Sequence, residues 1–173
     1  VYTLIGNAHL DRLGDRPGVF KAKTEMLGFM PDNGTVFLNA DDDLLSTCSC
    51  RQSKVMYGLS ENADVRAENI KTESAAKQTC DIISGKRRMH VGIPAYGRHM
   101  VYAALEGAAV GIKFGLSDDE IIRGIAAYKT VGRRANVIDT GYITIIDDCY
   151  NANPDSVKCA IDSMAEGGGR KVC

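Results

Sequence analysis

The sequence predicts an α/β fold, in which a mixed β-sheet carries helices on its flanks. Apolar runs at residues 35–39 and 142–146 each end in a cluster of Asp and Asn residues, as strands of open α/β sheets do at their carboxyl ends. Helix signals such as capping residues open segments 17–27, 100–114 and 118–128. Strands and helices that alternate in this way are typical of α/β proteins.

Several further segments have the pattern of strands. Residues 1–5 are an apolar run that ends at a Gly-Asn pair, so we expect a buried strand with functional residues just beyond it. Residues 53–58 read SKVMYG, and residues 63–70 alternate apolar with polar side chains. Residues 81–85 and 90–94 flank a basic turn and predict a hairpin.

Length and charge limit the class of protein. A chain of 173 residues is long enough for one domain and part of another. Its formal net charge is -1, whereas general nucleic-acid binders and membrane-surface binders carry an excess of basic residues. No apolar run approaches the roughly 20 residues that a membrane helix needs. We therefore expect a cytoplasmic protein that neither binds nucleic acid nor inserts into a membrane.

The six cysteines predict neither disulfides nor a zinc site. No C-x-x-C pair occurs, and the three histidines lie far apart in the sequence. We expect reduced thiols, as in a cytoplasmic protein.

Both ends of the sequence look like truncations of a longer chain. The first residue is Val1, and residues 170–173 read as the first residues of a buried strand. We therefore expect a fragment of a longer protein.

A helix with a reactive lysine is predicted after residue 15. Asp15 is a suitable N-cap, and Pro17 fits the first turn, where its missing N–H costs nothing. Val19, Lys23, Met26 and Leu27 share one face by their i, i+3, i+4 spacing. Lys23 is therefore expected against apolar neighbours, where desolvation favours its neutral amine. The alternative is a lysine whose stem packs on the core while its head reaches solvent.

The second polar cluster follows the strand at residues 35–39. Asp41, Asp42 and Asp43 could hold a cation or a substrate amine at the strand end. The alternative is that they cap the next helix.

The last strand and helix predict an anion site. The run at 142–146 is followed by DDCYNANPDS, in which Asn153 is a suitable N-cap and Pro154 the first residue of a helix. A positive helix N-terminus beside a sheet edge suits an anion. A helix at 118–128 is also expected, because Ser117 and Glu120 form a capping box.

Four strings together resemble one enzyme family. AHLDRLGDRPGVFKAKTEM, VFLNADDDLL, GRHMVYAALEGAAVGIKFGLSDDEI and DDCYNANPDS are similar to sequences of the Mur ligases, ATP-dependent amide-bond-forming enzymes of peptidoglycan synthesis. The resemblance implies a Mur ligase central domain, with an ATPase-like mixed sheet, at residues 1–130. It implies the start of a Rossmann-like C-terminal domain at residues 131–173. Met100 and Ala103 depart from it, because the family typically has asparagines there.

The resemblance also implies roles for single residues. A histidine placed like His9 ligates Mg²⁺ in the family, and a lysine placed like Lys23 is carbamylated, its new carboxylate supporting a second Mg²⁺ site. An arginine placed like Arg133 faces the nucleotide across the interdomain cleft; the alternative is a solvated linker arginine. The residues that the resemblance assigns to the nucleotide site are Arg133, Asp148, Tyr150, Asn151 and Asn153.

The string DDCYNANPDS implies one branch of the family. That branch uses ATP and Mg²⁺ to add D-alanyl-D-alanine to UDP-N-acetylmuramoyl-tripeptide through an acyl phosphate. The G-x-x-x-x-G-K-[ST] phosphate loop of the family does not occur in the chain, so we expect these residues alone to be inactive. Two alternatives stay open: a related ligase, such as another Mur ligase or a folylpolyglutamate synthase-like enzyme, and a truncated product without catalysis.

Overall fold

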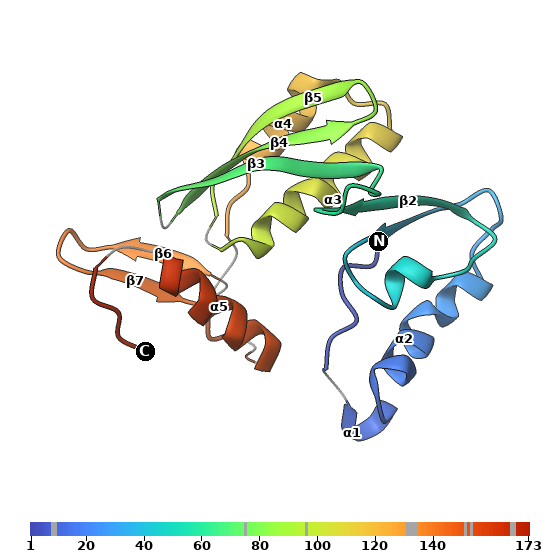
Figure 1. Ribbon diagram of the computed structural model, residues 1–173, viewed down its shortest axis with the longest axis horizontal. Helices are drawn as coiled ribbons and strands as arrows, with labels where there is room; N and C mark the ends of the chain where they lie inside the picture. Colours follow the sequence, from blue (N-terminus) through green and yellow to red (C-terminus); the bar gives the residue numbers. More distant parts are fainter. Residues whose placement is uncertain are drawn as a thin grey trace.

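The computed structural model describes residues 1–7, 10–74, 76–95, 97–130, 135–150, 152, 154–166 and 169–173. Figure 1 shows the arrangement of the elements. The helices are α1 (Leu10–Leu13), α2 (Arg16–Thr24), α3 (His99–Lys113), α4 (Asp118–Ala126) and α5 (Pro154–Glu166), with short 3-10 helices η1 (Glu25–Gly28) and η2 (Leu45–Thr47). The strands are β1 (Thr35–Asn39), β2 (Ser53–Gly58), β3 (Val65–Ser74), β4 (Lys77–Ser84), β5 (Arg87–Ile93), β6 (Asn136–Asp139) and β7 (Thr144–Asp147).

The main sheet is mixed, as the sequence predicts. Its five strands lie in the order β1-β2-β3-β4-β5, with β1, β2 and β3 parallel and β3, β4 and β5 antiparallel. The hairpin of β4 and β5 pairs Ile82 with Met89 and has one wet face, because buried Met89, Val91 and Ile93 alternate with more exposed residues. The predicted hairpin is therefore confirmed, with longer strands than the sequence indicated.

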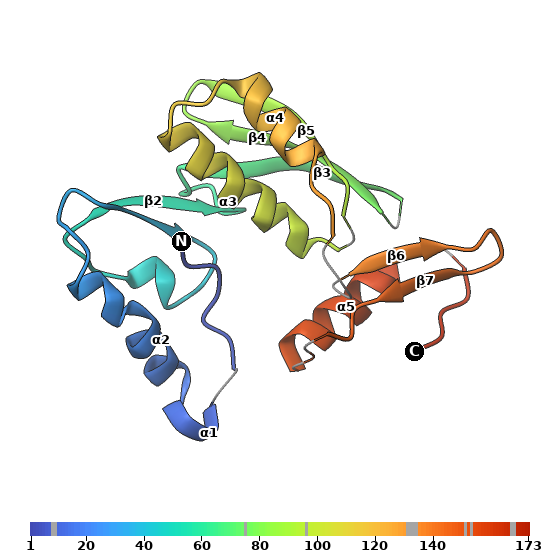
Figure 2. The same ribbon diagram turned by 180° about the vertical axis from the view of Figure 1, so that it is seen from behind.

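Helices cover this sheet unevenly. Figure 2 shows α3 and α4 on one side of β3, β4 and β5. Val101, Leu105 and Ala108 of α3 are fully buried in the core that this layer forms with the sheet. On β1, Phe37 points into that core, whereas Leu38 joins a second core with Val19 of α2. The parallel edge of the sheet is thus buried on both faces, which is the doubly covered arrangement of α/β proteins.

The predicted strand at residues 1–5 is wrong in extent. Among the described residues, the backbone of this segment pairs with the sheet only at a parallel bridge between Tyr2 and Leu38. The backbone N–H of Tyr2 donates to Phe37 at 2.9 Å, and the carbonyl of Tyr2 accepts from Asn39 at 3.2 Å. Tyr2 and Ile5 are buried, but Leu4 is exposed, so the segment leaves the sheet after a single pairing.

Helix α2 begins where the sequence predicts and ends earlier. The carboxylate of Asp15 accepts a 2.8 Å hydrogen bond from the backbone N–H of Gly18, which confirms the N-cap. The α-helix ends at Thr24 and tightens into η1, which rotates Met26 into solvent while Leu27 stays buried. The predicted capping box of α4 is also confirmed, since Ser117 and Glu120 bond reciprocally.

The C-terminal unit consists of β6, β7 and α5. β7 begins at Thr144, two residues later than predicted, and pairs antiparallel with β6, which the sequence analysis did not identify. Helix α5 begins at Pro154 as expected. Residues 170–173 are wrong as a predicted strand start, because they are exposed and have no regular structure.

Other expectations concern the whole chain. All six cysteines are free thiols. Within the part of the chain that the structure describes, no helix is long and apolar enough to cross a bilayer.

We expect Leu105→Ala to lower the free energy of unfolding by about 2–5 kcal/mol, because Leu105 is 0% exposed and its truncation leaves a cavity. Urea-induced unfolding measures this change. The matched control is Leu13→Ala, which removes an exposed side chain and should change stability by less than about 1 kcal/mol. Equal effects of the two substitutions would contradict the packing described here.

Candidate functional site

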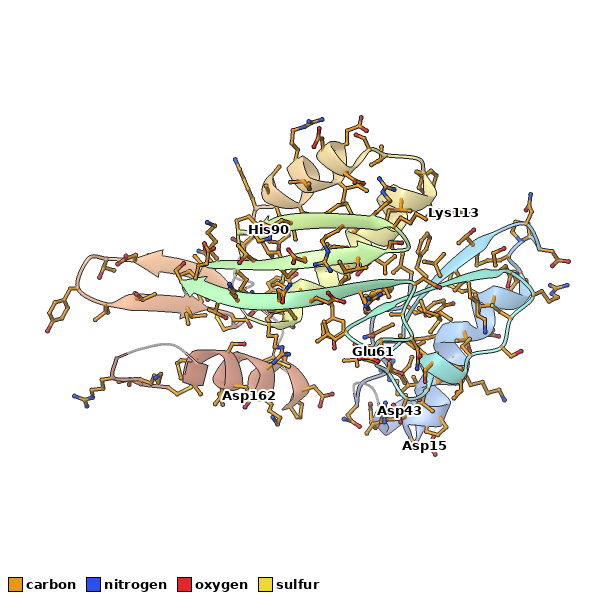
Figure 3. The ribbon with its side chains drawn as sticks, turned by 45° about the horizontal axis from the view of Figure 1, so that its top comes forward. Asp15, Asp43, Glu61, His90, Lys113 and Asp162 are labelled. Atoms are coloured by element: carbon orange, nitrogen blue, oxygen red, sulfur yellow. The ribbon has the colours of Figure 1, made fainter. Side chains whose placement is uncertain are left out.

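Polar side chains from three parts of the chain meet where residues 1–5, called the first segment below, and β1 end. They come from residues 5–7, from the loop after β1 and from the start of α2. Figure 3 shows Asp43 and Asp15 at this end of the molecule, Asp43 on the loop after β1 and Asp15 ahead of α2. Because β1 and the first segment run parallel, their carboxyl ends lie at the same edge of the sheet.

The backbone of Ile5 is fixed on both sides. Its N–H donates to the carboxylate of Asp42 at 2.8 Å, and its carbonyl accepts from Nε of Arg16 at 2.9 Å. Arg16 also donates to Asp43 at 3.0 Å, and its guanidinium holds the pKa of that carboxyl below its ordinary value. This cluster sets the direction in which the chain leaves Ile5 toward Asn7.

Asp42 is the buried carboxylate of this cluster, with 4% of its surface exposed. Besides Ile5, it accepts from the backbone N–H groups of Leu44 at 3.0 Å and Leu45 at 2.8 Å. A buried carboxylate needs such donors, because an unpaired one is costly. Asp42 thus holds the backbone at the start of the turn that leads into η2, but as a buried carboxylate and not as a solvated helix cap.

Asp41 joins the loop after β1 to α3 and β2. Its carboxylate accepts from the backbone N–H of Ser60 at 3.0 Å and from the hydroxyl of Tyr102 at 2.9 Å. Burial, with the added effect of Asp41, raises the pKa of Tyr102 to about 12, so the phenol stays a donor at neutral pH. Gly58 permits this contact, because a Cβ there would lie 2.7 Å from the carboxylate.

The idea of a cation site at these three acids is not supported. Each of the three carboxylates is occupied by donors of the protein. Within the described residues, no group of three or more His, Cys, Asp or Glu side chains is placed to hold a metal ion.

The predicted burial of Lys23 is wrong. The residue is exposed, and its ammonium donates to the carbonyl of Leu4 at 2.8 Å. Because the helix ends at Thr24, the apolar face at Lys23 does not continue to Met26, which is exposed. The structure therefore does not surround the amine of Lys23 with apolar neighbours, and the alternative of a lysine with its head toward solvent describes it better.

A cavity of about 280 Å³ lies between α3 and the C-terminal unit. Ala95, which lies between β5 and α3, lines it together with His99 and Met100 of α3, and Asp148 and Ser156 line it from the C-terminal unit. The ring of His99 is crowded, and this desolvation lowers its pKa, while the carboxylate of Asp148 opposes the shift. An imidazole and a carboxylate thus face one cavity, which can offer both hydrogen-bond donors and acceptors to a polar ligand.

Only part of the predicted site can be traced. Asp148 lines the cavity and accepts from the backbone N–H of Ala135 at 3.0 Å. Tyr150 is 67% exposed and is not among the residues that line the cavity. The predicted residues outside the described part of the chain are His9, Arg133, Asn151 and Asn153.

Two contributors were not identified from the sequence. Arg16 holds the carbonyl of Ile5, and His99 lines the cavity beside the C-terminal unit. Only His99 had a signal, since it directly precedes the helix predicted at residues 100–114. The partners of Arg16 lie 11 and 27 positions away, so no local pattern marks them.

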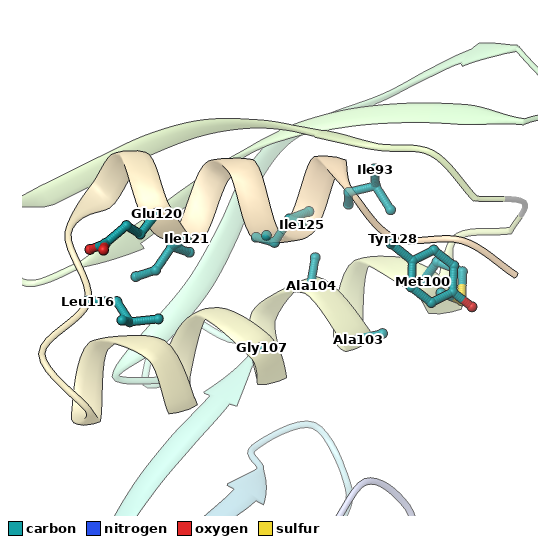
Figure 4. A pocket seen from close by; sticks show the side chains of 11 residues that line it. Ile93, Met100, Ala103, Ala104, Gly107, Leu116, Glu120, Ile121, Ile125 and Tyr128 are labelled. Atoms are coloured by element: carbon teal, nitrogen blue, oxygen red, sulfur yellow. The ribbon is translucent and has the colours of Figure 1, made fainter.

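A second hollow lies between α3 and α4 (Figure 4). It has a volume of about 280 Å³ and an apolar lining, with Ala103, Gly107 and Gly124 leaving space between the two helices. Met100 and Tyr128 line both this hollow and the cavity beside the C-terminal unit, so the two spaces are neighbours.

Comparison with known proteins finds one family over most of the chain. Residues 1–111 match the family model of the Mur ligase middle domain. A UDP-N-acetylmuramoyl-tripeptide--D-alanyl-D-alanine ligase from Bacillus subtilis is 31% identical over 175 residues, covering 99% of this chain and 37% of that protein. A relative of the same name from Escherichia coli is 35% identical, covering 95% of this chain and 37% of its own length.

Solved structures share the fold. A MurF crystal structure from Acinetobacter baumannii aligns with a TM-score of 0.86 at 25% identity and covers 96% of this chain and 37% of that one. The MurF ligase from Thermotoga maritima, solved in complex with ADP, shows the same fold at a TM-score of 0.83 and 22% identity, covering 97% of this chain and 40% of that one. The chain thus spans a little over a third of the length of the relatives it matches.

We expect Arg16→Ala to lower the free energy of unfolding by about 1–3 kcal/mol, because it leaves the carbonyl of Ile5 without this donor and removes the cation nearest to Asp42. The matched control is Arg12→Ala. The side chain of Arg12 is 87% exposed, and its ion pair with Asp11 is long, at 4.0 Å, so this substitution should lower the free energy of unfolding by less than about 0.5 kcal/mol. Urea-induced unfolding of both variants measures the difference, and equal values would show that Arg16 does not fix Ile5.

Proposed function

Because this chain belongs to the Mur ligase family, we propose that the whole protein is an ATP-dependent ligase that joins D-alanyl-D-alanine to UDP-N-acetylmuramoyl-tripeptide. The observation that carries this branch is the name shared by relatives that match nearly the whole chain at 31% and 35% identity. The turn DDCYNANPDS supports it, since its sequence resembles that branch of the family. Asp148 of this turn lines the cavity between α3 and the C-terminal unit.

We divide the chain into a middle domain at residues 1–130 and the start of a C-terminal domain at residues 131–173. Two features support this division. The five-stranded sheet uses only strands before residue 94, and the two-stranded sheet uses only strands after residue 135. The family model ends at residue 111, within α3, so it does not by itself fix the boundary.

We propose that the cavity lined by His99 and Asp148 receives part of the nucleotide. It lies between the two proposed domains, where ligand pockets commonly form. A relative with the same fold was solved with ADP, which fits a nucleotide site in this family. Arg133, Tyr150, Asn151 and Asn153 are proposed to complete the site on the C-terminal side.

The proposed reaction has two steps. The carboxylate of the tripeptide attacks the γ-phosphorus of ATP, which forms an acyl phosphate and releases ADP. The amine of D-alanyl-D-alanine then attacks the acyl carbon, which forms the amide and expels phosphate, and the amine loses a proton. Such phosphoryl transfer depends mainly on positioning and on electrostatic stabilisation. The residues of this chain that serve positioning are Arg16 and Asp42, which fix Ile5, and Asp41 and Tyr102, which join the loop after β1 to α3.

Mg²⁺ stays part of the proposal on the strength of the resemblance. When bound, it would neutralise charge on the transferred phosphoryl group. We propose His9 as a ligand and a carbamate on Lys23 as support for a second ion. The described residues alone do not form a metal site. We also propose a cytoplasmic location, which fits six free thiols.

The decisive experiment is a ligase assay on the full-length protein that contains this chain. With ATP, UDP-N-acetylmuramoyl-tripeptide and D-alanyl-D-alanine, we expect ADP and the extended product by mass spectrometry. Parallel reactions offer L-alanine or L-glutamate as the acceptor. If product forms with one of these acceptors instead, the protein is a ligase but not of the D-alanyl-D-alanine-adding branch. If ATP is not turned over with any acceptor, the proposal that the protein is an enzyme is rejected.

We expect Lys23→Ala to lower kcat about 100-fold if its carbamate supports the charge of the transferred group. The matched control is Lys21→Ala, an exposed lysine on the same helix, which should keep wild-type activity. Loss of the Leu4 hydrogen bond could also reduce activity, so wild-type kcat is measured with and without bicarbonate. Full activity of Lys23→Ala, or a wild-type rate indifferent to bicarbonate, would reject the carbamate.

A further inference from the structure

A pair of residues 148 positions apart joins the two ends of the chain. The backbone N–H of Asn7 donates to Oδ2 of Asp155 at 3.1 Å, and the side-chain amide of Asn7 donates to both carboxylate oxygens at 3.3 Å. Asn7 lies just past the first segment, and Asp155 is the second residue of α5. The contact therefore connects the carboxyl edge of the main sheet to the C-terminal unit.

The use of this carboxylate is unexpected from local rules. An acid in the first turn of a helix usually stabilises the positive N-terminus of its own helix. Here the carboxylate of Asp155 accepts three hydrogen bonds from Asn7. Gly6 permits the approach, because a Cβ at that position would lie 3.1 Å from Oδ2 of Asp155.

The contact is anchored at a fixed point. Two residues before Asn7, the backbone of Ile5 is held by Asp42 on one side and Arg16 on the other. A carboxylate that binds Asn7 therefore binds a segment that is already immobilised. At the other end of the contact, Ser156 follows Asp155 directly and lines the cavity with His99.

We propose that Asp155 is a positioning residue: through Asn7 it holds the start of α5, and thereby the Ser156 side of the cavity, in register with the edge of the main sheet. The consequence for ligands rests on the proposed function, in which this cavity receives the nucleotide. Because binding and positioning are then coupled, a nucleotide in the cavity strengthens the contact, and the contact strengthens nucleotide binding by the same factor.

The first test measures the contact without any activity. In the full-length protein, amide hydrogen exchange at Asn7 reports its hydrogen bond to Asp155. We expect Asp155→Ala to speed this exchange about 5- to 10-fold. Asp155→Asn keeps one acceptor oxygen and should lie between Ala and wild type. The matched control is Asp162→Ala, an acid on the same helix (Figure 3) that pairs with Lys158 and should leave Asn7 unchanged.

The second test measures the consequence for the cavity with ADP as the probe. We expect Asp155→Ala and Asn7→Ala each to raise the Kd for ADP about 5-fold. The double variant should be no weaker than either single variant, because both remove the same contact. ADP should also slow exchange at Asn7 in the wild type and not in Asp155→Ala.

The outcomes separate this proposal from the proposed function. Unchanged exchange at Asn7 in Asp155→Ala overturns the positioning role, whatever the ligase assay gives. Faster exchange together with an unchanged Kd for ADP overturns the link to the cavity. If the wild type binds no ADP, the proposed nucleotide site fails, and the exchange measurement still decides the contact. Additive effects of the two single variants would also contradict a shared contact.

Discussion

The backbone of Ile5 is the constraint on which this edge of the molecule depends. The first segment has a single bridge to the sheet, so the pairing alone cannot fix the residues beyond it. Asp42 supplies the acceptor and Arg16 the donor that a longer strand would have supplied through its neighbours. Asp42 is itself held by the turn that follows β1. The position of β1 therefore fixes the position of Ile5, and Ile5 in turn fixes the position of Asn7.

This constraint also relates the two proposed domains. The cavity beside His99 has walls from both, and walls on separate units bind a ligand well only when the units are held in register. Gly6 serves that register, because it lets the carboxylate of Asp155 approach the backbone where a side chain would obstruct it. Gly58 does the same within the proposed middle domain, where it admits the carboxylate of Asp41. Small residues at these two points therefore matter for position as much as the charged residues that they admit.

Local signals predicted much of the fold, and long-range contacts account for the errors. Asp15, Ser117 and Pro154 mark helix starts because capping depends only on neighbouring residues. The predicted burial of Lys23 is wrong because residues share one helix face only as long as the α-helix continues. This helix ends at Thr24, one residue after Lys23. Arg16 and Asp155 could not be found from the sequence, since their partners lie on other segments and no spacing rule connects them. The resemblance placed Asp148 at a ligand site, but the cavity that it lines became visible only in three dimensions.

Lys23 has a structural task that bears on its proposed chemistry. Its ammonium donates to the carbonyl of Leu4, Arg16 donates to the carbonyl of Ile5, and the hydroxyl of Tyr2 donates to the carbonyl of Lys23. Helix α2 therefore holds the first segment at successive carbonyls, which replaces the ladder that the segment lacks. Carbamylation adds CO₂ to the neutral amine with loss of a proton and leaves one N–H on the nitrogen. In the proposed carbamate, that N–H would still be able to donate to the carbonyl of Leu4, and the new carboxylate would be available to another partner.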